Sequence, residues 1–319
     1  MDISPDSLTL LLLCSQLAIE DDTPQPMTLR EWNPIARKLT AANLRPADLL
    51  EGQNLKNVFT KDEVERVMFL TARADALQRV LDRLSLLGIF PLTRADEGYP
   101  QRYRQRLQES APPVLFYAGE IALLGQPGIA VVGSRHLDEA GQECARYVGN
   151  ACGIAGQVLY SGGARGVDTI SMKAALEARG TAVAVLADSL ERAVRARKSK
   201  LQRGDLCLLT PYNPSSGFSV GAAMGRNRLI YALADYAIVV ASDAESGGTW
   251  AGATEALKHS WLPVFVLEHE GMPEGNRLLI QKGGLPFPHP FQEPPLKLQA
   301  WLREKSGNQL KPAGQLSLF

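Results

Sequence analysis

The sequence lacks an excess of charge of either sign, because 34 Lys and Arg residues balance 34 Asp and Glu residues. A neutral chain binds a polyanion only through a local basic patch, so binding driven by overall charge is excluded. Cysteine is also scarce, and the 4 cysteines are never spaced as C-x-x-C. We expect Cys14, Cys144, Cys152 and Cys207 to be small buried residues in a reducing compartment, with no disulfide and no metal.

Long hydrophobic runs are missing as well. The apolar stretch Leu8 to Leu13 is too short to cross a bilayer, and the first residues lack the basic segment of a signal peptide. The 4 histidines show no metal-ligand spacing, although His136 lies beside a candidate site described below. These absences predict a cytoplasmic protein with no membrane association, no metal ion and no cofactor.

Glycine-bearing turns stand out in what remains. Ile129–Val132 and Val158–Tyr160 are short apolar runs that each stop at a glycine turn, as buried parallel strands do. Ligands bind at the carboxyl ends of such strands, where glycines let a phosphate approach the backbone. Both turns also carry an arginine, Arg135 and Arg165, so we expect an anionic ligand.

These turns have two other interpretations. The glycines could serve only to close tight connections between strand and helix, but that role needs no arginine. A dinucleotide site of the usual kind is disfavoured, because no second glycine follows Gly133 at the G-x-G-x-x-G spacing.

The segment from residue 128 to about 284 alternates strand-like runs with helix-length segments. This order predicts an α/β fold built on a doubly wound, mainly parallel sheet. The predicted helices begin near Ala140, Val167, Gly225, Thr249 and Asn276. The predicted strands are Ile129–Val132, Val158–Tyr160, Ala182–Leu186, Leu206–Leu209, Tyr236–Ala241 and Val264–Leu267.

The whole chain divides into four parts, one of which contains this α/β segment. Residues 1–90 have apolar residues at three- and four-residue steps and are predicted to form an N-terminal helical domain. Residues 91–284 form the α/β domain, which opens with a connector and a predicted edge strand at Val114–Tyr117. Residues 285–302 are predicted to be a proline-rich linker with a short helix around Trp301, and residues 303–319 a disordered polar tail.

Two more segments have the composition of anion sites. Arg226, Asn227 and Arg228 follow Gly225 at a predicted helix start and could read phosphates, or could be a solvated helix cap. The turn Ser246-Gly247-Gly248-Thr249 also opens a predicted helix and could hold a phosphate. Glu255, further along that helix, could act as a general base or a ribose ligand, or could simply face solvent.

A basic block from Arg192 to Arg203 contains no acidic residue, so it could extend a nucleic-acid track or form a solvated face. The full set of candidate phosphate- and nucleic-acid-binding residues is Gly133, Ser134, Arg135, Gly162, Gly163, Arg165, Gly166, Asp168, Lys198, Lys200, Arg203, Arg226, Asn227, Arg228, Ser246, Gly247, Gly248 and Thr249.

These motifs, in this order, resemble the DprA/Smf family of DNA-processing proteins. The matching stretches are Asp96–Pro100, Pro112–Gly119, Ala130–Arg135, Ser161–Asp168, Gly225–Ile230 and Ser246-Gly247. The resemblance implies an extended Rossmann-like fold, a homodimer and the binding of single-stranded DNA. It also implies delivery of that DNA to a RecA-type recombinase in recombination, repair or transformation, without catalytic turnover.

A second resemblance keeps an enzymatic alternative open. The turn from Gly247 to Trp250, followed by Glu255, is similar to the glycine-rich motif of the related lysine-decarboxylase-like (LOG) nucleotide-handling proteins. That similarity implies a nucleotide sensor or a nucleotide N-glycosidase, with Glu255 as its catalytic residue.

The last five residues carry a motif of a different kind. Gln315, Leu316, Ser317, Leu318 and Phe319 follow a polar stretch and turn abruptly apolar. They resemble the pentapeptide by which bacterial replication and repair proteins bind the sliding clamp of DNA polymerase. The alternative is a frayed hydrophobic chain end that binds no partner. We expect Leu318 and Phe319 to fill an apolar pocket on the clamp while Gln315 forms a hydrogen bond nearby.

Overall fold

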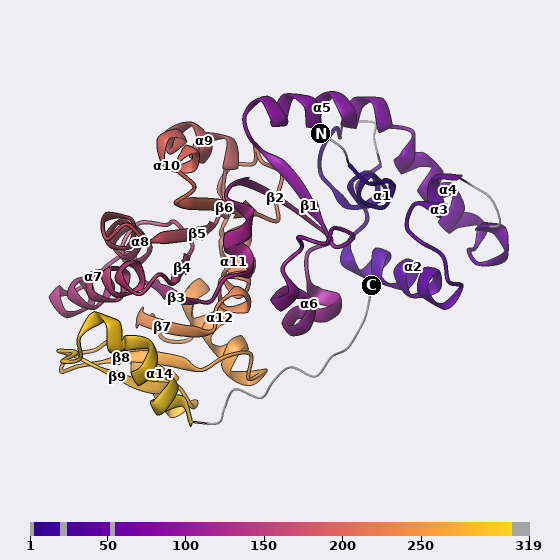
Figure 1. Ribbon diagram of the computed structural model, residues 1–319. Helices are drawn as coiled ribbons and strands as arrows, with labels where there is room; N and C mark the ends of the chain where they lie inside the picture. The colour runs from indigo at the N-terminus through magenta and orange to yellow at the C-terminus, as the bar shows by residue number, and fades with distance from the viewer. Residues whose placement is uncertain (1–2, 20–23, 52–54, 308–319) are drawn as a thin grey trace.

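A nine-stranded sheet forms the centre of the structure, a computed structural model that describes residues 3–19, 24–51 and 55–307. The strands lie in the order β1-β2-β6-β5-β4-β3-β7-β8-β9 (Figure 1). Their bounds are β1 Phe90–Thr93, β2 Val114–Gly119, β3 Gly128–Gly133, β4 Val158–Ser161, β5 Thr181–Val185, β6 Leu206–Thr210, β7 Tyr236–Ala241, β8 Val264–Glu268 and β9 Leu285–Pro288.

The strand order creates a topological switch point between β3 and β7. The chain runs outward from β3 through β4 and β5 to β6, and then crosses to the other side of β3 to form β7. The seven neighbouring strands β6-β5-β4-β3-β7-β8-β9 are parallel to one another. In contrast, β2 is antiparallel to both β1 and β6. The prediction of a doubly wound, mainly parallel sheet is therefore confirmed, and ligands of such sheets bind at the switch point.

The six strands predicted in the α/β segment are confirmed as β3 to β8. Their apolar runs are buried on both faces of the sheet, which explains why they lack an alternating pattern. The segment predicted as an edge strand, Val114–Tyr117, is also a strand but lies between β1 and β6. The true edge is β1, which the sequence analysis missed because it is short and contains Pro91.

The predicted linker from residue 285 is wrong at its start. Leu285–Pro288 forms β9, the other edge of the sheet, with Phe287 opposite Leu267 of β8. An edge strand tolerates proline because one of its sides has no neighbouring strand to receive an N–H group. Burial of Phe287 anchors the strand to the sheet.

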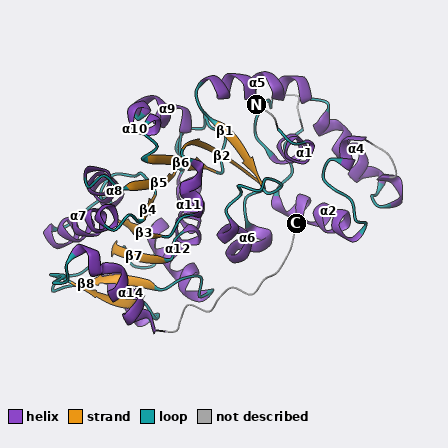
Figure 2. Ribbon diagram, in the orientation of Figure 1, coloured by secondary structure: helices purple, strands orange, loops and turns teal. Residues whose placement is uncertain are grey.

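Helices cover both faces of the sheet (Figure 2). On one face, α6, α11, α12 and α13 enclose one apolar core. On the other face, the N-terminal helices, α7, α8, α9 and α14 share a second core. The helices are α1 Pro5–Cys14, α2 Leu29–Ala41, α3 Asp48–Glu51, α4 Lys61–Thr71, α5 Ala74–Leu86, α6 Gln101–Leu107, α7 Glu139–Ile154, α8 Val167–Glu177, α9 Leu190–Ala196, α10 Lys198–Gln202, α11 Val220–Leu233, α12 Gly247–Lys258, α13 Glu274–Gln281 and α14 Leu298–Ser306.

The last helix is longer than the sequence predicted. α14 continues to Ser306, into the segment expected to be disordered, because Leu298 and Leu302 are buried against the sheet. Trp301 packs against Phe265 and Phe287 with ring centroids 5.6 and 5.5 Å apart. The pentapeptide at residues 315–319 lies outside the described residues.

The cysteines fit the prediction of buried thiols, with Cys144, Cys152 and Cys207 inside the cores and Cys14 partly buried. Burial raises the pKa of the Cys144 and Cys152 thiols to about 12. None of the helices in the described ranges has the length and apolar character needed to cross a membrane.

Candidate nucleic-acid interface

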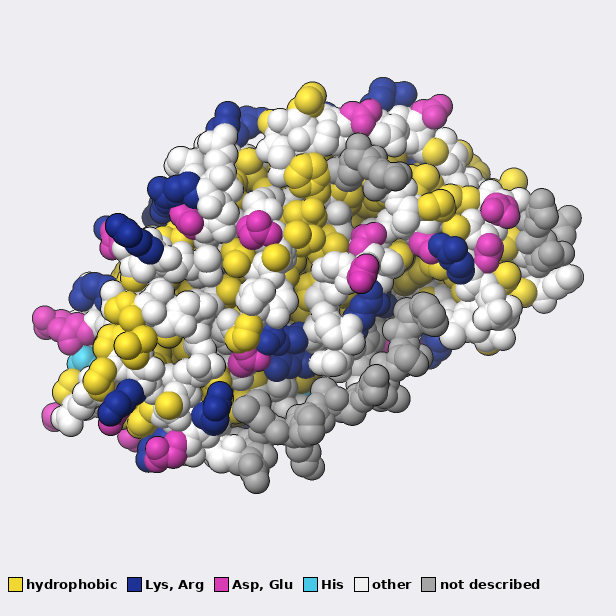
Figure 3. All heavy atoms as spheres, in the orientation of Figure 1, with side chains coloured by type: hydrophobic (Ala, Val, Ile, Leu, Met, Phe, Trp, Pro, Cys, Tyr) yellow, Lys and Arg dark blue, Asp and Glu magenta, His cyan; other side chains and the backbone are white. Residues whose placement is uncertain are grey.

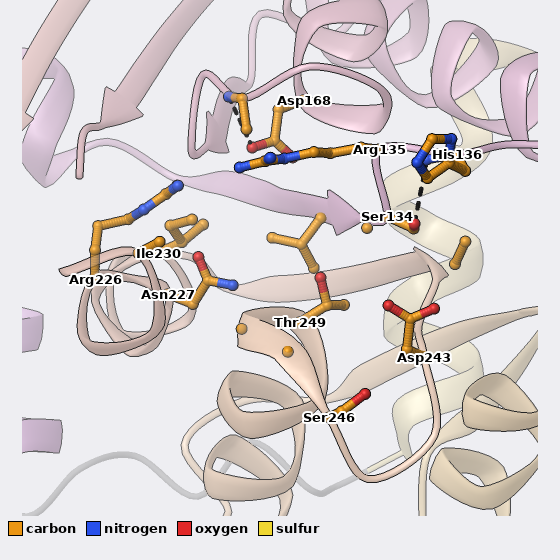
Figure 4. Close-up of a pocket in the computed structure, with 17 residues that line it drawn as sticks. Ser134, Arg135, His136, Asp168, Arg226, Asn227, Ile230, Asp243, Ser246 and Thr249 are labelled. Atoms are coloured by element: carbon orange, nitrogen blue, oxygen red, sulfur yellow. Dashed lines mark hydrogen bonds between the residues drawn. The ribbon is translucent and has the colours of Figure 1, made fainter. Parts of the chain in front are cut away.

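A cavity of about 260 Å³ opens at the switch point, beyond the carboxyl ends of β3 and β7 (Figure 4). The loops after β3, β4 and β7 line it together with α11 and the first turn of α12. The predicted residues that line it are Gly133, Ser134, Arg135, Asp168, Arg226, Asn227, Ser246, Gly247, Gly248 and Thr249. Four separate sequence motifs therefore meet in one place.

Glycines allow the loops of the cavity to lie against one another. Gly166 has φ +86°, and a Cβ on it would lie 2.5 Å from the Ser134 carbonyl oxygen and 2.7 Å from the Arg135 Cα. Gly133 also lies close to β7, where a Cβ would be 3.0 Å from the Ala241 nitrogen. The Ser134 N–H donates to the Ala241 carbonyl at 2.8 Å. The turn carrying Arg135 is thus held between β7 and the β4–α8 loop.

Asp168 closes the β4–α8 loop from inside. Its carboxylate accepts hydrogen bonds from the backbone N–H groups of Gly162 at 3.1 Å and Ala164 at 3.2 Å. Burial raises the pKa of this carboxyl, while the Arg226 guanidinium and the two N–H groups oppose the shift. Asp168 borders the cavity, and its Oδ2 atom accepts both of these hydrogen bonds from the loop. Its role is to shape the site.

Arg226 is the most unusual residue of the cavity. It lies within α11 with only 6% of its surface exposed, and its Nε and Nη1 atoms have no hydrogen-bond partner among the described residues. Burial lowers the pKa of the guanidinium, and Asp168 counteracts the shift only in part. The guanidinium lies against Gly162, where a Cβ would coincide with it. A buried cation without a hydrogen-bond partner is costly, and an anion in the cavity would relieve that cost.

Arg135 approaches the same end of the cavity from the loop after β3. In Figure 4 the guanidinium groups of Arg135 and Arg226 point toward one another. Their like charges repel, which contributes to the lowered pKa of Arg226. The first turn of α12, from Gly247 to Thr249, adds backbone N–H groups that are not used within the helix. The cavity therefore brings two guanidinium groups and a helix N-terminus together.

The comparison with known families agrees with this geometry. A model for the family described as DNA recombination-mediator protein A matches residues 91–288. The chain belongs to this family.

The chain is similar in sequence to proteins of two bacteria. The chain is 32% identical over 180 residues to DNA processing protein DprA of Streptococcus pneumoniae, covering 54% of this chain and 62% of that protein. It is 32% identical over 184 residues to protein Smf of Escherichia coli, covering 54% of this chain and 48% of that one. The chain thus spans less than two thirds of these relatives' own length.

Two solved structures of DNA processing protein A have the same fold. The Streptococcus pneumoniae structure covers 90% of this chain and 95% of its own, with a TM-score of 0.63 at 22% identity. The structure from Helicobacter pylori, which addresses the single-stranded DNA binding mode of that protein, covers 67% of this chain and 94% of its own. Its TM-score is 0.53 at 24% identity.

Not every residue predicted to bind phosphate lines the cavity. Arg228 lies two residues beyond Arg226 on α11, so its side chain leaves the helix in another direction. Its Nη2 donates to the Ser110 carbonyl at 2.7 Å, and its Nη1 lies 3.8 Å from the Glu255 carboxylate. The structure therefore does not place Arg228 at a phosphate in the cavity. Glu255, the contact of Arg228, is likewise not among the residues that line the cavity.

The basic block forms α9 and α10. The cavity lies at the carboxyl ends of the central strands β3 and β7. α10 leads directly into the start of β6, and Leu201 packs against Gly119 opposite Cys207. Lys198, Lys200 and Arg203 are therefore at the amino ends of the parallel strands, away from the cavity. A continuous track from Arg226 to these residues is wrong for a single chain.

Acidic residues from nearby also neutralise part of the block. Arg203 pairs with Asp205 at 2.7 Å, Arg192 with Asp188 at 2.7 Å, and Arg195 with Glu191 at 3.7 Å. On the face drawn in Figure 3, Lys and Arg side chains are dispersed among Asp and Glu. The block is therefore not a stretch of unpaired positive charge.

Several details of the site escaped the sequence analysis. α11 begins at Val220, not near Gly225, because Ser219 caps it by accepting a hydrogen bond from the Ala222 N–H at 3.1 Å. Arg226 therefore lies inside the helix. Arg165 is exposed on its loop and does not border the cavity, and Gly162, Gly163 and Gly166 shape that loop without lining the cavity.

Two side chains near the cavity were also missed. Asp243 follows β7 and lines the mouth, as Figure 4 shows. Phe218 precedes α11, and the Arg135 Cζ lies 5.6 Å from its ring centroid. No signal in the sequence separates either residue from the polar or apolar residues of an ordinary loop. Within the described part of the chain, no group of His, Cys, Asp and Glu is arranged to hold a metal ion.

Proposed function

We propose that this protein binds single-stranded DNA at the switch-point cavity, with a backbone phosphate held between Arg226 and Arg135. The observation that carries the proposal is the buried guanidinium of Arg226, whose Nε and Nη1 atoms have no hydrogen-bond partner among the described residues. A phosphate oxygen accepts charge-assisted hydrogen bonds from such a group and separates it from the second cation. The free N–H groups of α12 favour the same anion.

Membership of the DNA recombination-mediator family supports a polynucleotide as the source of that phosphate. The Helicobacter pylori relative binds single-stranded DNA, according to the description of its structure. The cavity itself offers few charges, so affinity must come from a small number of phosphates plus contacts to sugar and base. Such binding is sensitive to salt but less steeply than in proteins with long basic tracks.

A salt titration tests the proposal. We expect a fluorescent oligothymidine to bind in low salt, with an affinity that falls as salt rises. If two or three phosphates are neutralised, the slope of log K against log salt should be roughly −1.5 to −2. Fluorescence anisotropy measures both quantities. Duplex DNA and thymidine monophosphate serve as competitors. Absence of binding in low salt, or equal competition by the mononucleotide, would contradict the proposal.

We further propose that the bound strand is delivered to a RecA-type recombinase and that the protein acts as a homodimer. The support is the resemblance of the motifs to the DprA/Smf family together with the family match over residues 91–288. Light scattering gives the oligomeric state. Co-sedimentation of purified recombinase with the protein–DNA complex tests delivery, and a recombinase that sediments equally without the protein counts against it.

The pentapeptide supports a second interaction, with the sliding clamp of DNA polymerase. A labelled peptide of residues 306–319 should bind purified clamp with a dissociation constant on the order of micromolar. Replacing Leu318 and Phe319 together by alanine should abolish binding, because both apolar anchors are lost. Ser317→Asp is the matched control and should keep binding, since the motif accepts serine or aspartate there. A wild-type peptide that does not bind at tens of micromolar refutes the interaction.

A further inference from the structure

Phe218 is an aromatic residue whose side chain is only partly packed. Its side chain belongs to a residue that is 53% exposed, at the position just before the N-cap Ser219 of α11. Hydrophobic residues at this position often pack against the fourth residue of the helix, which here is Ala223. Such packing would bury the ring, yet more than half of Phe218 remains open to solvent.

The ring is held at a defined place beside the cavity. Ser219 caps α11, and the Tyr212 hydroxyl donates to the Ala222 carbonyl at 2.9 Å, so the start of this helix is tied to the loop before it. The Arg135 Cζ lies 5.6 Å from the Phe218 ring centroid, and Arg135 itself lines the cavity. Val220 and Met224, which are 67% and 44% exposed, extend the apolar surface along α11.

This combination of groups fits an unpaired nucleobase. A flat apolar ring offers a stacking face to any base, and an adjacent guanidinium adds attraction to its π system and to the phosphate. Bases within a duplex already stack on their neighbours, so reaching the ring would require flipping one of them out at a cost. A peptide side chain could also cover the ring, but Arg135 beside it favours an occupant that carries negative charge.

We infer that Phe218 is the platform on which an unpaired base stacks while the neighbouring phosphate is held at Arg135 and Arg226. The inference rests on the proposed function and adds to it the residue that selects single strands. Because every base has a stacking face, the platform favours unpaired nucleotides without reading their sequence. The site thus combines one anion-binding position with one base-binding position.

Removing the base and removing the ring in parallel tests this inference. Fluorescence anisotropy should compare a single strand with a strand of equal length whose central positions are abasic. We expect Phe218→Ala to weaken binding of the normal strand about tenfold, and to change binding of the abasic strand less than about twofold. Phe218→Trp should restore binding, and its fluorescence should be quenched by the normal strand.

Phe69→Ala is the matched control, since Phe69 is 65% exposed on α4 and does not line the cavity. It should bind both strands as the wild type does. If Phe218→Ala binds the normal strand unchanged, or loses affinity equally for both strands, the stacking role is wrong. Light scattering of Phe218→Ala adds a further check, because dissociation of an oligomer would assign the ring to a protein contact. If the wild type binds neither strand, the proposed function fails first.

Discussion

Replacing Arg226 by methionine should weaken binding of single-stranded DNA about 100-fold, because two charge-assisted hydrogen bonds to a phosphate are lost. The variant should nevertheless remain folded and unfold in one cooperative transition. In the unliganded protein the guanidinium is buried and its Nε and Nη1 atoms find no partner within the described chain, so its loss removes a desolvation cost. The same loss removes the charge that opposes the raised pKa of the buried Asp168 carboxyl, and the two effects on stability act in opposite directions.

Arg228→Met is the matched control on the same helix, and its pattern should be reversed. Arg228 holds the Ser110 carbonyl and Glu255, so its loss should lower the free energy of unfolding slightly and leave DNA affinity nearly unchanged. Anisotropy and urea denaturation measure the two quantities for each variant. Equal losses of affinity in both variants, or an Arg226→Met variant that no longer unfolds cooperatively, would show that Arg226 is a structural residue.

Replacing Gly166 by alanine should reduce the free energy of unfolding by about 3 kcal/mol and disrupt the cavity. The backbone at this position has φ +86°, which disfavours a side chain, and the new Cβ would press on the Ser134 carbonyl and the Arg135 Cα. The β4–α8 loop and the turn carrying Arg135 must then separate. DNA affinity should therefore fall together with stability, measured by anisotropy and urea denaturation.

Gly156→Ala separates backbone strain from the contact between loops. Gly156 also has a positive φ, +65°, but no atom lies within 4 Å of the Cβ that alanine would add. Its replacement should cost about 1 kcal/mol and leave DNA affinity unchanged. If Gly166→Ala is no more harmful than Gly156→Ala, the close approach of the two loops is not required for the site.

The predicted residues that line the cavity share a local signal. Gly133 and Ser134 end a β-branched strand, and the arginine beside them was the reason to expect an anion. The glycine-bearing turn from Ser246 to Thr249 likewise indicates the start of a helix. Parallel strands place their carboxyl ends at one edge of the sheet, so motifs far apart in the chain could be expected to meet.

The sequence could not distinguish Arg226 from Arg228, because both occupy the same short motif. The distinction depends on what surrounds each side chain: Gly162 and a cavity for one, Ser110 and Glu255 for the other. The sequence could not place the basic block for a related reason. Its acidic partners Asp188 and Asp205 flank it in the sequence, but the position of its lysines at the amino ends of the strands is a property of the topology.

By itself, the sequence determined the alternation of strands and helices, the buried parallel sheet and the glycine-bearing turns at the ends of its strands, since these follow from burial and backbone preference within short segments. Only the tertiary structure decided that β1 and β9 are the edges, that Arg226 is a buried cation without a hydrogen-bond partner among the described residues, and that Phe218 remains exposed beside Arg135. The physical reason is that pairing, desolvation and exposure depend on neighbours brought together by folding, which no local pattern specifies.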